Sequence, residues 1–141
     1  MIYLFTDSSC SKSYGVGCYT LMNSINDLPI LNTITLPNKS STEMEFLTIL
    51  YSLNSTDIND PMQDITIYTD CAGFIQYCQT GMNHSIDDET HQQLQNHFIN
   101  HKIMVNKIKG HSKQDNIITR EQEIFRMIDK HARKTLRSIP N

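Results

Sequence analysis

The sequence predicts an α/β fold that opens with a three-stranded antiparallel meander, and three observations support this prediction. Segments rich in β-branched and aromatic residues occupy positions 2–6, 15–22 and 31–36, and the connections between them are short enough for hairpins. No helical pattern lies between these segments, which argues against the βαβ order of a doubly wound sheet. From about residue 40 onward, helical and strand patterns alternate.

The later elements follow from the spacing of apolar residues and from helix-end signals. Phe46, Leu47, Leu50 and Leu53 recur at helical spacing after candidate cap residues at 40–42. The elements predicted after this helix are a strand at 64–70, helices at 72–79 and 87–101, a strand at 103–108 and a long amphipathic helix at 119–137. With 141 residues, of which 38% are hydrophobic, we expect a single compact domain over residues 1–141.

Lysine and arginine are concentrated in the last part of the chain. Residues 102–141 hold ten of the twelve Lys and Arg residues but four of the fifteen acidic residues. A basic segment of this kind is typical of nucleic-acid-binding surfaces, because Lys and Arg replace the counterions that surround phosphates. A solvated helix face gives the same pattern, so charge alone leaves both interpretations open.

The sequence also limits where we expect the protein to act. No stretch approaches the roughly 18 consecutive apolar residues of a membrane span, and residues 1–7 lack the basic region and cleavage site of a signal peptide. The four cysteines have neither zinc-site nor disulfide-framework spacing, and we expect reduced thiols that pack. We therefore expect a soluble intracellular protein, in the cytoplasm or, in a eukaryote, in the nucleus.

Two predicted strands end in the same pattern, in which apolar residues run into Thr-Asp, at Asp7 and again at Asp70. When two such strands are parallel and adjacent, their carboxyl ends meet at the crevice where α/β sheets bind ligands. Two carboxylates in one small volume favour a raised pKa or a cation between them, and hard oxygen ligands suit Mg²⁺ or Mn²⁺. Each aspartate taken alone also fits a strand-end turn residue.

Glu45 and Asp129 are the third and fourth candidate ligands, and each has a structural alternative. A capping box over residues 42–45 would use Glu45 to close the helix start, whereas an equally good box over 40–43 would leave Glu45 free. Asp129 lies at the border of the apolar face of the last helix, but it also stands four residues before Arg133, at ion-pair spacing. Spacing leaves both alternatives open.

Six short motifs follow one another along nearly the whole chain. They are residues 5–10 (FTDxSC), 15–17 (GxG), 44–46 (MEF), 68–70 (YTD), 109–112 (KGHS) and 129–133 (DxxAR). In this order and at these separations they resemble the motifs of a type 1 ribonuclease H. The resemblance implies the ribonuclease H-like fold, which is a five-stranded mixed sheet flanked by helices. In that sheet, two parallel strands join the three-stranded antiparallel meander.

The resemblance also implies a reaction and a set of site residues. Asp7, Glu45, Asp70 and Asp129 would hold two divalent ions, Mg²⁺ with Mn²⁺ as a substitute, and His111 would assist proton movement or product release. The implied reaction is endonucleolytic hydrolysis of the RNA strand of an RNA/DNA hybrid, which leaves 5′-phosphate and 3′-hydroxyl ends. Ions about 3.5 to 4 Å apart would activate the attacking water and stabilise the leaving oxygen. We expect a monomer with no small-molecule cofactor and no membrane partner.

Hybrid recognition would rely on backbone contacts and on 2′-hydroxyls in the minor groove, and not on base sequence. The residues that we expect to contact nucleic acid are Ser9, Cys10, Ser41, Thr42, Lys109, Lys130, Arg133 and Lys134. The chain departs from the usual residues of the family at Ser8, at Ser41 and Thr42, and at Phe125. Some of these positions help relatives to read 2′-hydroxyls, so the resemblance supports metal binding more directly than hybrid specificity.

Three functions stay open on the sequence alone. The first is ribonuclease H, the second is a nuclease of the same fold that acts on DNA as an exonuclease or junction resolvase, and the third is an inactive domain that binds nucleic acid or a protein. Four mutually repelling acids in one crevice argue against the third function. The meander and the His111 motif favour the first. Since His111 and Asp129 are further apart than in the family pattern, Glu121 or Glu123 is an alternative fourth ligand.

Overall fold

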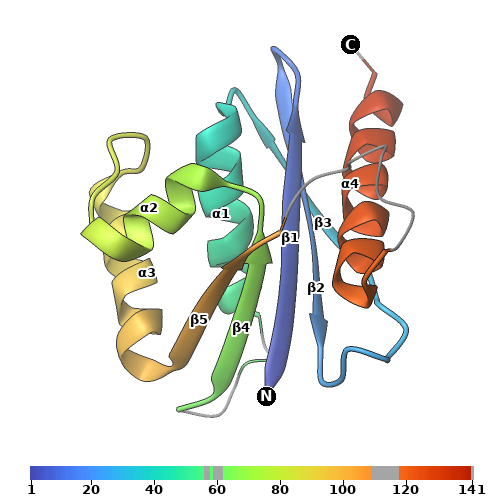
Figure 1. Cartoon of the computed structure of the whole chain (residues 1–141). Helices are drawn as coiled ribbons and strands as arrows, with labels where there is room; N and C mark the ends of the chain where they lie inside the picture. Colours follow the sequence, from blue (N-terminus) through green and yellow to red (C-terminus); the bar gives the residue numbers. More distant parts are fainter. Residues whose placement is uncertain (56–57, 59–61, 109–117, 141) are drawn as a thin grey trace.

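The structure is a computed structural model that describes residues 1–55, 58, 62–108 and 118–140. It confirms the predicted order of strands and helices (Figure 1). The elements are β1 (Ile2–Cys10), β2 (Tyr14–Met22), β3 (Asn32–Pro37), α1 (Ser41–Leu53), β4 (Asp64–Thr69), α2 (Ala72–Thr80), α3 (Asp88–Asn100), β5 (Lys102–Lys107) and α4 (Arg120–Ser138). Within the described ranges, no helix is long and apolar enough to cross a membrane.

The five strands form one mixed sheet in the order β3-β2-β1-β4-β5. β1, β2 and β3 pair antiparallel, as expected for two consecutive hairpins. β4 pairs parallel with β1, and β5 pairs parallel with β4. The predicted five-stranded mixed sheet is therefore confirmed, and its parallel part brings the carboxyl ends of β1 and β4 to the same edge.

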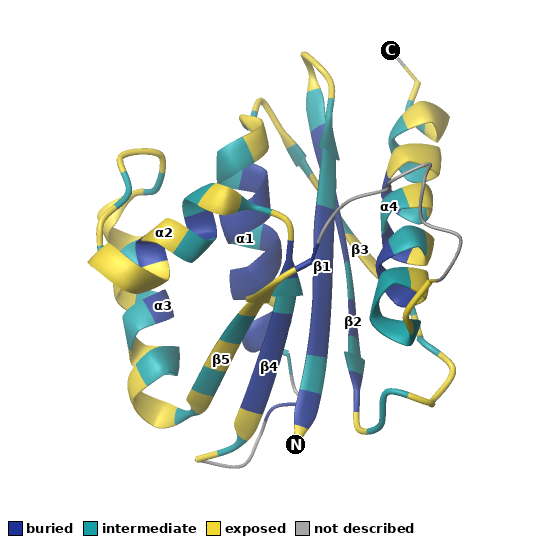
Figure 2. Ribbon diagram, viewed as in Figure 1, coloured by how far each residue is buried: buried dark blue, intermediate teal, exposed yellow. Residues whose placement is uncertain are grey.

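Helices cover both faces of the sheet, with α1, α2 and α3 on one side and α4 on the other (Figure 1). Successive side chains of β1 pack alternately against the two helix layers, because side chains along a strand point to opposite faces of the sheet. Leu4 packs in the cluster that contains Phe46 of α1, whereas Phe5 packs in the cluster that contains Ile124 of α4. Most of β1 and β4 is buried, while α4 exposes its outer face (Figure 2).

α1 approaches β2 closely at Gly17. A Cβ atom added to Gly17 would lie 1.9 Å from Thr48 Oγ1 and 2.9 Å from Thr48 Cβ. Thr48 is fully buried, and its hydroxyl donates a 2.7 Å hydrogen bond to the Met44 carbonyl, so its side chain has little freedom to move. The missing side chain of Gly17 therefore sets how near the sheet the helix carrying Glu45 can lie.

β1 extends to Cys10, four residues beyond the end that the sequence predicted. Its antiparallel register with β2 continues to Cys10, whereas its parallel register with β4 stops at Phe5 and Tyr68. Asp7 was expected at the end of a strand but lies inside β1. The prediction of the strand end was wrong because β2 continues to support β1 after the pairing with β4 has stopped.

Candidate metal centre

Asp7, Glu45 and Asp70 come together near the carboxyl end of β4. Asp7 lies on β1, Glu45 lies on α1, and Asp70 directly follows β4. One carboxylate oxygen from each residue lies within 4.8 Å of the oxygens from the other two. The structure thus brings together the two aspartates of the repeated Thr-Asp pattern and adds a third carboxylate from the helix layer.

The cap at the start of α1 decides which glutamate is free. Ser40 is the N-cap residue, and its hydroxyl oxygen accepts a hydrogen bond from the Glu43 N–H at 3.1 Å. The Glu43 carboxylate accepts a bond from the Ser40 N–H at 3.3 Å, which completes the capping box. The alternative box that ended at Glu45 is therefore wrong. Glu45 is released from capping and is only 8% exposed.

Ser8 is the hydrogen-bond partner of Glu45, a contact that was not predicted from the sequence. Glu45 Oε1 accepts a 2.7 Å hydrogen bond from the Ser8 hydroxyl and a 3.1 Å bond from the Ser8 N–H. Strand alternation could have indicated this contact, because it directs Ser8 to the face opposite to Asp7, where the helix begun at residue 41 packs.

Burial and mutual repulsion raise the pKa values of the three carboxyl groups. The pKa of Asp7 rises to about 9, first because of burial and then because of the nearby charge of Glu45. Burial also raises the pKa of Glu45 to about 7, although the hydrogen bond from the Ser8 side chain lowers it. The pKa of Asp70 is raised too, mainly by burial. A cation among the three groups would relieve this repulsion.

The residues present fit a divalent metal ion. Glu45 Oε2 is buried and has no hydrogen-bond partner among the residues that the structure describes. An unpaired buried oxygen is costly, and a bound cation would satisfy it. The donor set consists of carboxylate oxygens, which are the hard ligands that Mg²⁺ and Mn²⁺ prefer.

Asp129 lies beside this cluster but is not one of the three converging residues. Its Oδ2 accepts a 2.7 Å bond from Arg133 Nη2, so the ion pair predicted from helical spacing is present. Asp129 is nevertheless close enough for its side chain to contribute to the raised pKa of Asp7 and for its charge to contribute to that of Asp70. Among the residues that the structure describes, it is the one of the four predicted ligands that forms an ion pair with a cationic side chain.

The two alternative fourth ligands lie in the first turn of α4. Glu123 forms a 2.7 Å ion pair with Arg120, whose guanidinium also donates to the carbonyls of Ile25 and Asp27 in the loop between β2 and β3. Glu121 contributes to the raised pKa of Tyr68, for which burial is the larger cause. Neither glutamate is among the causes of the raised pKa of Asp7, whereas Asp129 is.

The residues expected to bind nucleic acid fall into three groups. Ser9 and Cys10 continue β1 beyond Asp7, and the Cys10 thiol has a pKa that burial raises and the nearby Ser41 hydroxyl lowers. Ser41 and Thr42 begin α1. Lys130, Arg133 and Lys134 are exposed on α4. Lys109 and His111 lie outside the described residues.

We define the basic face of α4 by five of its six Lys and Arg residues, which line one depression together with Asp129. They are Arg126, Lys130, Arg133, Lys134 and Arg137. Because Asp129 is part of the same depression, the basic face borders the carboxylate cluster. Half of the Lys and Arg residues that the sequence concentrates in residues 102–141 therefore lie next to the candidate metal centre.

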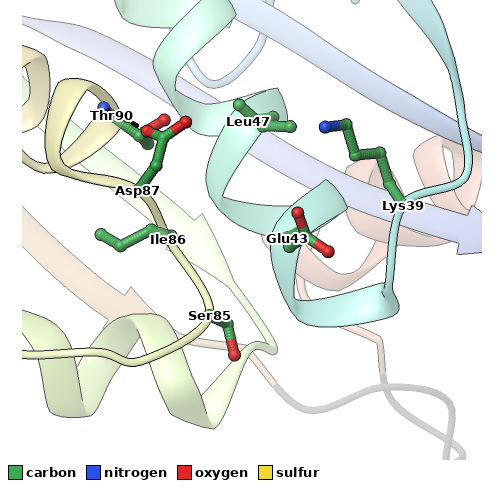
Figure 3. Close-up of a pocket in the computed structure, with 7 residues that line it drawn as sticks. All are labelled: Lys39, Glu43, Leu47, Ser85, Ile86, Asp87 and Thr90. Atoms are coloured by element: carbon green, nitrogen blue, oxygen red, sulfur yellow. Dashed lines mark hydrogen bonds between the residues drawn. The ribbon is translucent and has the colours of Figure 1, made fainter.

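A separate small cavity of about 70 Å³ lies between the start of α1 and the start of α3 (Figure 3). It contains none of the three converging carboxylates. Asp87 is the N-cap of α3, and its side chain accepts a 2.7 Å hydrogen bond from the Thr90 N–H. The residues lining the cavity are Lys39, Glu43, Leu47, Ser85, Ile86, Asp87 and Thr90. Both of its acids, Glu43 and Asp87, already serve as helix-capping groups, so the cavity offers no free carboxylate.

Fold and site together define an α/β domain with a candidate divalent-cation centre at the end of its parallel strands. The family model described as RNase H matches residues 1–136. The chain therefore belongs to the RNase H family, which confirms the resemblance and the general class of nuclease. No curated protein matches the sequence closely enough to count as a relative.

The raised pKa of Asp7 predicts how stability depends on pH without divalent ions. In the unfolded chain Asp7 has a pKa of 3.8 and loses its proton, whereas in the folded protein it keeps the proton up to about pH 9. The free energy of unfolding should therefore fall as pH rises between these two values. The slope for one proton is at most about 1.4 kcal/mol per pH unit.

Urea unfolding from pH 6.5 to 9 in EDTA measures this slope. Asp7→Asn should flatten it, while Asp64→Asn, an exposed change at the far end of β4, should not. Unfolding free energies that rise with pH in the wild type, or an equal slope in Asp7→Asn, would contradict the prediction.

Proposed function

We propose that this protein is a ribonuclease H that hydrolyses the RNA strand of RNA/DNA hybrids by a metal-dependent, endonucleolytic reaction. The observation that carries the proposal is the convergence of Asp7, Glu45 and Asp70 within 4.8 Å in a domain of the RNase H family. The buried Oε2 of Glu45, which has no hydrogen-bond partner among the described residues, supports a cation at this position. The expected products carry 5′-phosphate and 3′-hydroxyl ends.

The residues that would hold two Mg²⁺ or Mn²⁺ ions are Asp7, Glu45 and Asp70, with Asp129 beside them. When bound, such ions lower the pKa of water and stabilise negative charge on the leaving 3′ oxygen. Asp7 lies on β1, Glu45 on α1 and Asp129 on α4, and Asp70 directly follows β4, so the site is assembled only in the folded state. We assign proton movement or product release to His111, which belongs to the KGHS motif.

The basic face of α4 would bind the phosphate backbone next to the carboxylates. This assignment is supported by the depression that these cationic residues share with Asp129. Ser9, Cys10, Ser41 and Thr42, which lie on β1 and at the start of α1, would contact the minor groove. Residues 71–101, which include α2 and α3, contain neither Lys nor Arg. These two helices therefore offer no Lys or Arg side chain to the phosphate backbone of a nucleic acid.

Charge reversal on α4 tests this binding surface. We expect Lys130→Glu combined with Lys134→Glu to weaken duplex binding by roughly tenfold or more and to reduce the salt-dependence slope by about two, since each phosphate contact contributes about 0.9. Fluorescence anisotropy at several salt concentrations measures both quantities. Lys102→Glu, an exposed change at the start of β5, is the control and should have little effect. Unchanged affinity and slope in the double variant would show that α4 does not bind the backbone.

The chemistry is tested by the ends of the products. A 5′-labelled RNA strand in a hybrid should be cut internally with Mg²⁺ and should stay intact in EDTA. The upstream fragments should carry 3′-hydroxyls that a polymerase extends, because water and not the neighbouring 2′-hydroxyl is the nucleophile. Cyclic 2′,3′-phosphate ends, or cutting that persists in EDTA, would contradict the proposed reaction.

A further inference from the structure

Ser8 makes two hydrogen bonds to one oxygen of Glu45. Its hydroxyl donates to Oε1 at 2.7 Å, and its backbone N–H donates to the same atom at 3.1 Å. The second oxygen, Oε2, is buried and has no hydrogen-bond partner within the described part of the chain. The two oxygens of this carboxylate are therefore in unlike environments, and Ser8 causes the difference.

The sheet explains why the Ser8 N–H is available to a helix side chain. The parallel pairing of β1 with β4 ends at Phe5 and Tyr68, whereas the antiparallel pairing with β2 continues past Ser8. Beyond Phe5, the backbone groups of β1 that face the β4 side have no strand partner within the described residues, and the Ser8 N–H donates to Glu45 of α1 instead. The hydroxyl adds a second donor from the same residue, which restrains rotation of the carboxylate.

We propose that Ser8 is a positioning residue of the metal centre, whose hydroxyl holds Glu45 Oε1 so that Oε2 stays available to a divalent ion. The inference rests on the proposed function, because it takes the three carboxylates as ligands. Without the hydroxyl, Oε1 keeps its backbone donor, but the carboxylate can rotate and offer either oxygen. Residues that orient a metal ligand typically contribute about 10- to 100-fold to metal affinity.

Mn²⁺ binding to the full chain tests this role, followed by electron paramagnetic resonance of the free ion. Ser8→Ala should raise the Mn²⁺ dissociation constant by about tenfold. Ser8→Thr, which keeps a hydroxyl and suits a strand, should restore affinity to within about twofold of the wild type. Ser13→Ala is the matched control, since Ser13 is exposed in the turn between β1 and β2. Circular dichroism and urea unfolding in EDTA should show that each variant is folded at the titration temperature.

Each outcome decides a separate point. Wild-type affinity in Ser8→Ala, or equally weak binding by Ser8→Thr and Ser8→Ala, would overturn the role of the hydroxyl while leaving the metal centre intact. Absence of Mn²⁺ binding by the wild type would instead overturn the proposed metal centre, and the role of Ser8 with it. Weak binding confined to Ser8→Ala, in a protein that unfolds like the wild type without metal, would support the proposal.

Discussion

Asp70→Asn is expected to lower metal-dependent cleavage by about three orders of magnitude while sparing the fold. Loss of a metal ligand removes several kcal/mol of transition-state stabilisation, and each 1.4 kcal/mol corresponds to a factor of ten in rate. Asp70 follows β4 and contributes to the raised pKa of Asp7, so its neutralisation relieves repulsion in the metal-free site. The metal-free protein should therefore be at least as stable as the wild type.

Single-turnover cleavage of a hybrid, with enzyme in excess, measures the effect of Asp70→Asn on the chemical step. Asp64→Asn is the matched control, because it makes the same change at the exposed start of the same strand and should cleave like the wild type. Binding of the hybrid in EDTA should be similar for both variants. Unchanged turnover in Asp70→Asn would remove Asp70 from the metal centre.

Gly17→Ala is expected to destabilise the fold by about 3 kcal/mol, the upper part of the range for overpacked cores. The added methyl would collide with Thr48 Oγ1, which lies 1.9 Å from the position of the new Cβ atom. Thr48 is buried and hydrogen-bonded to the Met44 carbonyl, so α1 would have to move away from β2. Urea denaturation measures the change in the free energy of unfolding.

A double-mutant cycle assigns the effect of Gly17→Ala to this contact. Thr48→Ala removes Oγ1 and Cγ2 of Thr48, which lie 1.9 and 2.9 Å from the position of the new methyl group. The double variant should therefore recover part of the stability that Gly17→Ala loses. Gly73→Ala is the control, since its added Cβ would meet no atom closer than 3.6 Å. Equal destabilisation by Gly17→Ala in the wild-type and Thr48→Ala backgrounds would show that the contact is not the cause.

The order of elements could be predicted from sequence because strand and helix periods are local properties. The convergence of Asp7 and Asp70 could also be predicted, since it requires only that their strands be parallel neighbours. The end of β1 could not, because it depends on how far pairing with β2 continues after pairing with β4 has stopped. Strand length at such an edge is decided by the neighbouring strands and not by the strand's own residues.

The alternatives at Glu45 and Asp129 show a second limit of sequence analysis. The sequences of the two overlapping capping boxes, over residues 40–43 and 42–45, fit the capping pattern equally well. In the structure the box over residues 40–43 forms, and Glu45 instead contacts Ser8, 37 positions away in the chain. Asp129 forms the ion pair with Arg133 that helical spacing predicted, and its side chain also contributes to the raised pKa of Asp7, whereas its role as a fourth ligand stays a prediction. Helical spacing therefore identifies neighbours on one helix but not the partners that the sheet brings to them.

The most direct test of the proposed function is cleavage of matched labelled substrates with Mg²⁺ and then with Mn²⁺. The set contains an RNA/DNA hybrid, double-stranded RNA, double-stranded DNA and the single strands, all of one sequence. We predict metal-dependent internal cuts confined to the RNA strand of the hybrid. Cutting of DNA would contradict the hybrid specificity and indicate a DNA nuclease of the same fold, and cutting of no substrate would contradict the assignment as a nuclease.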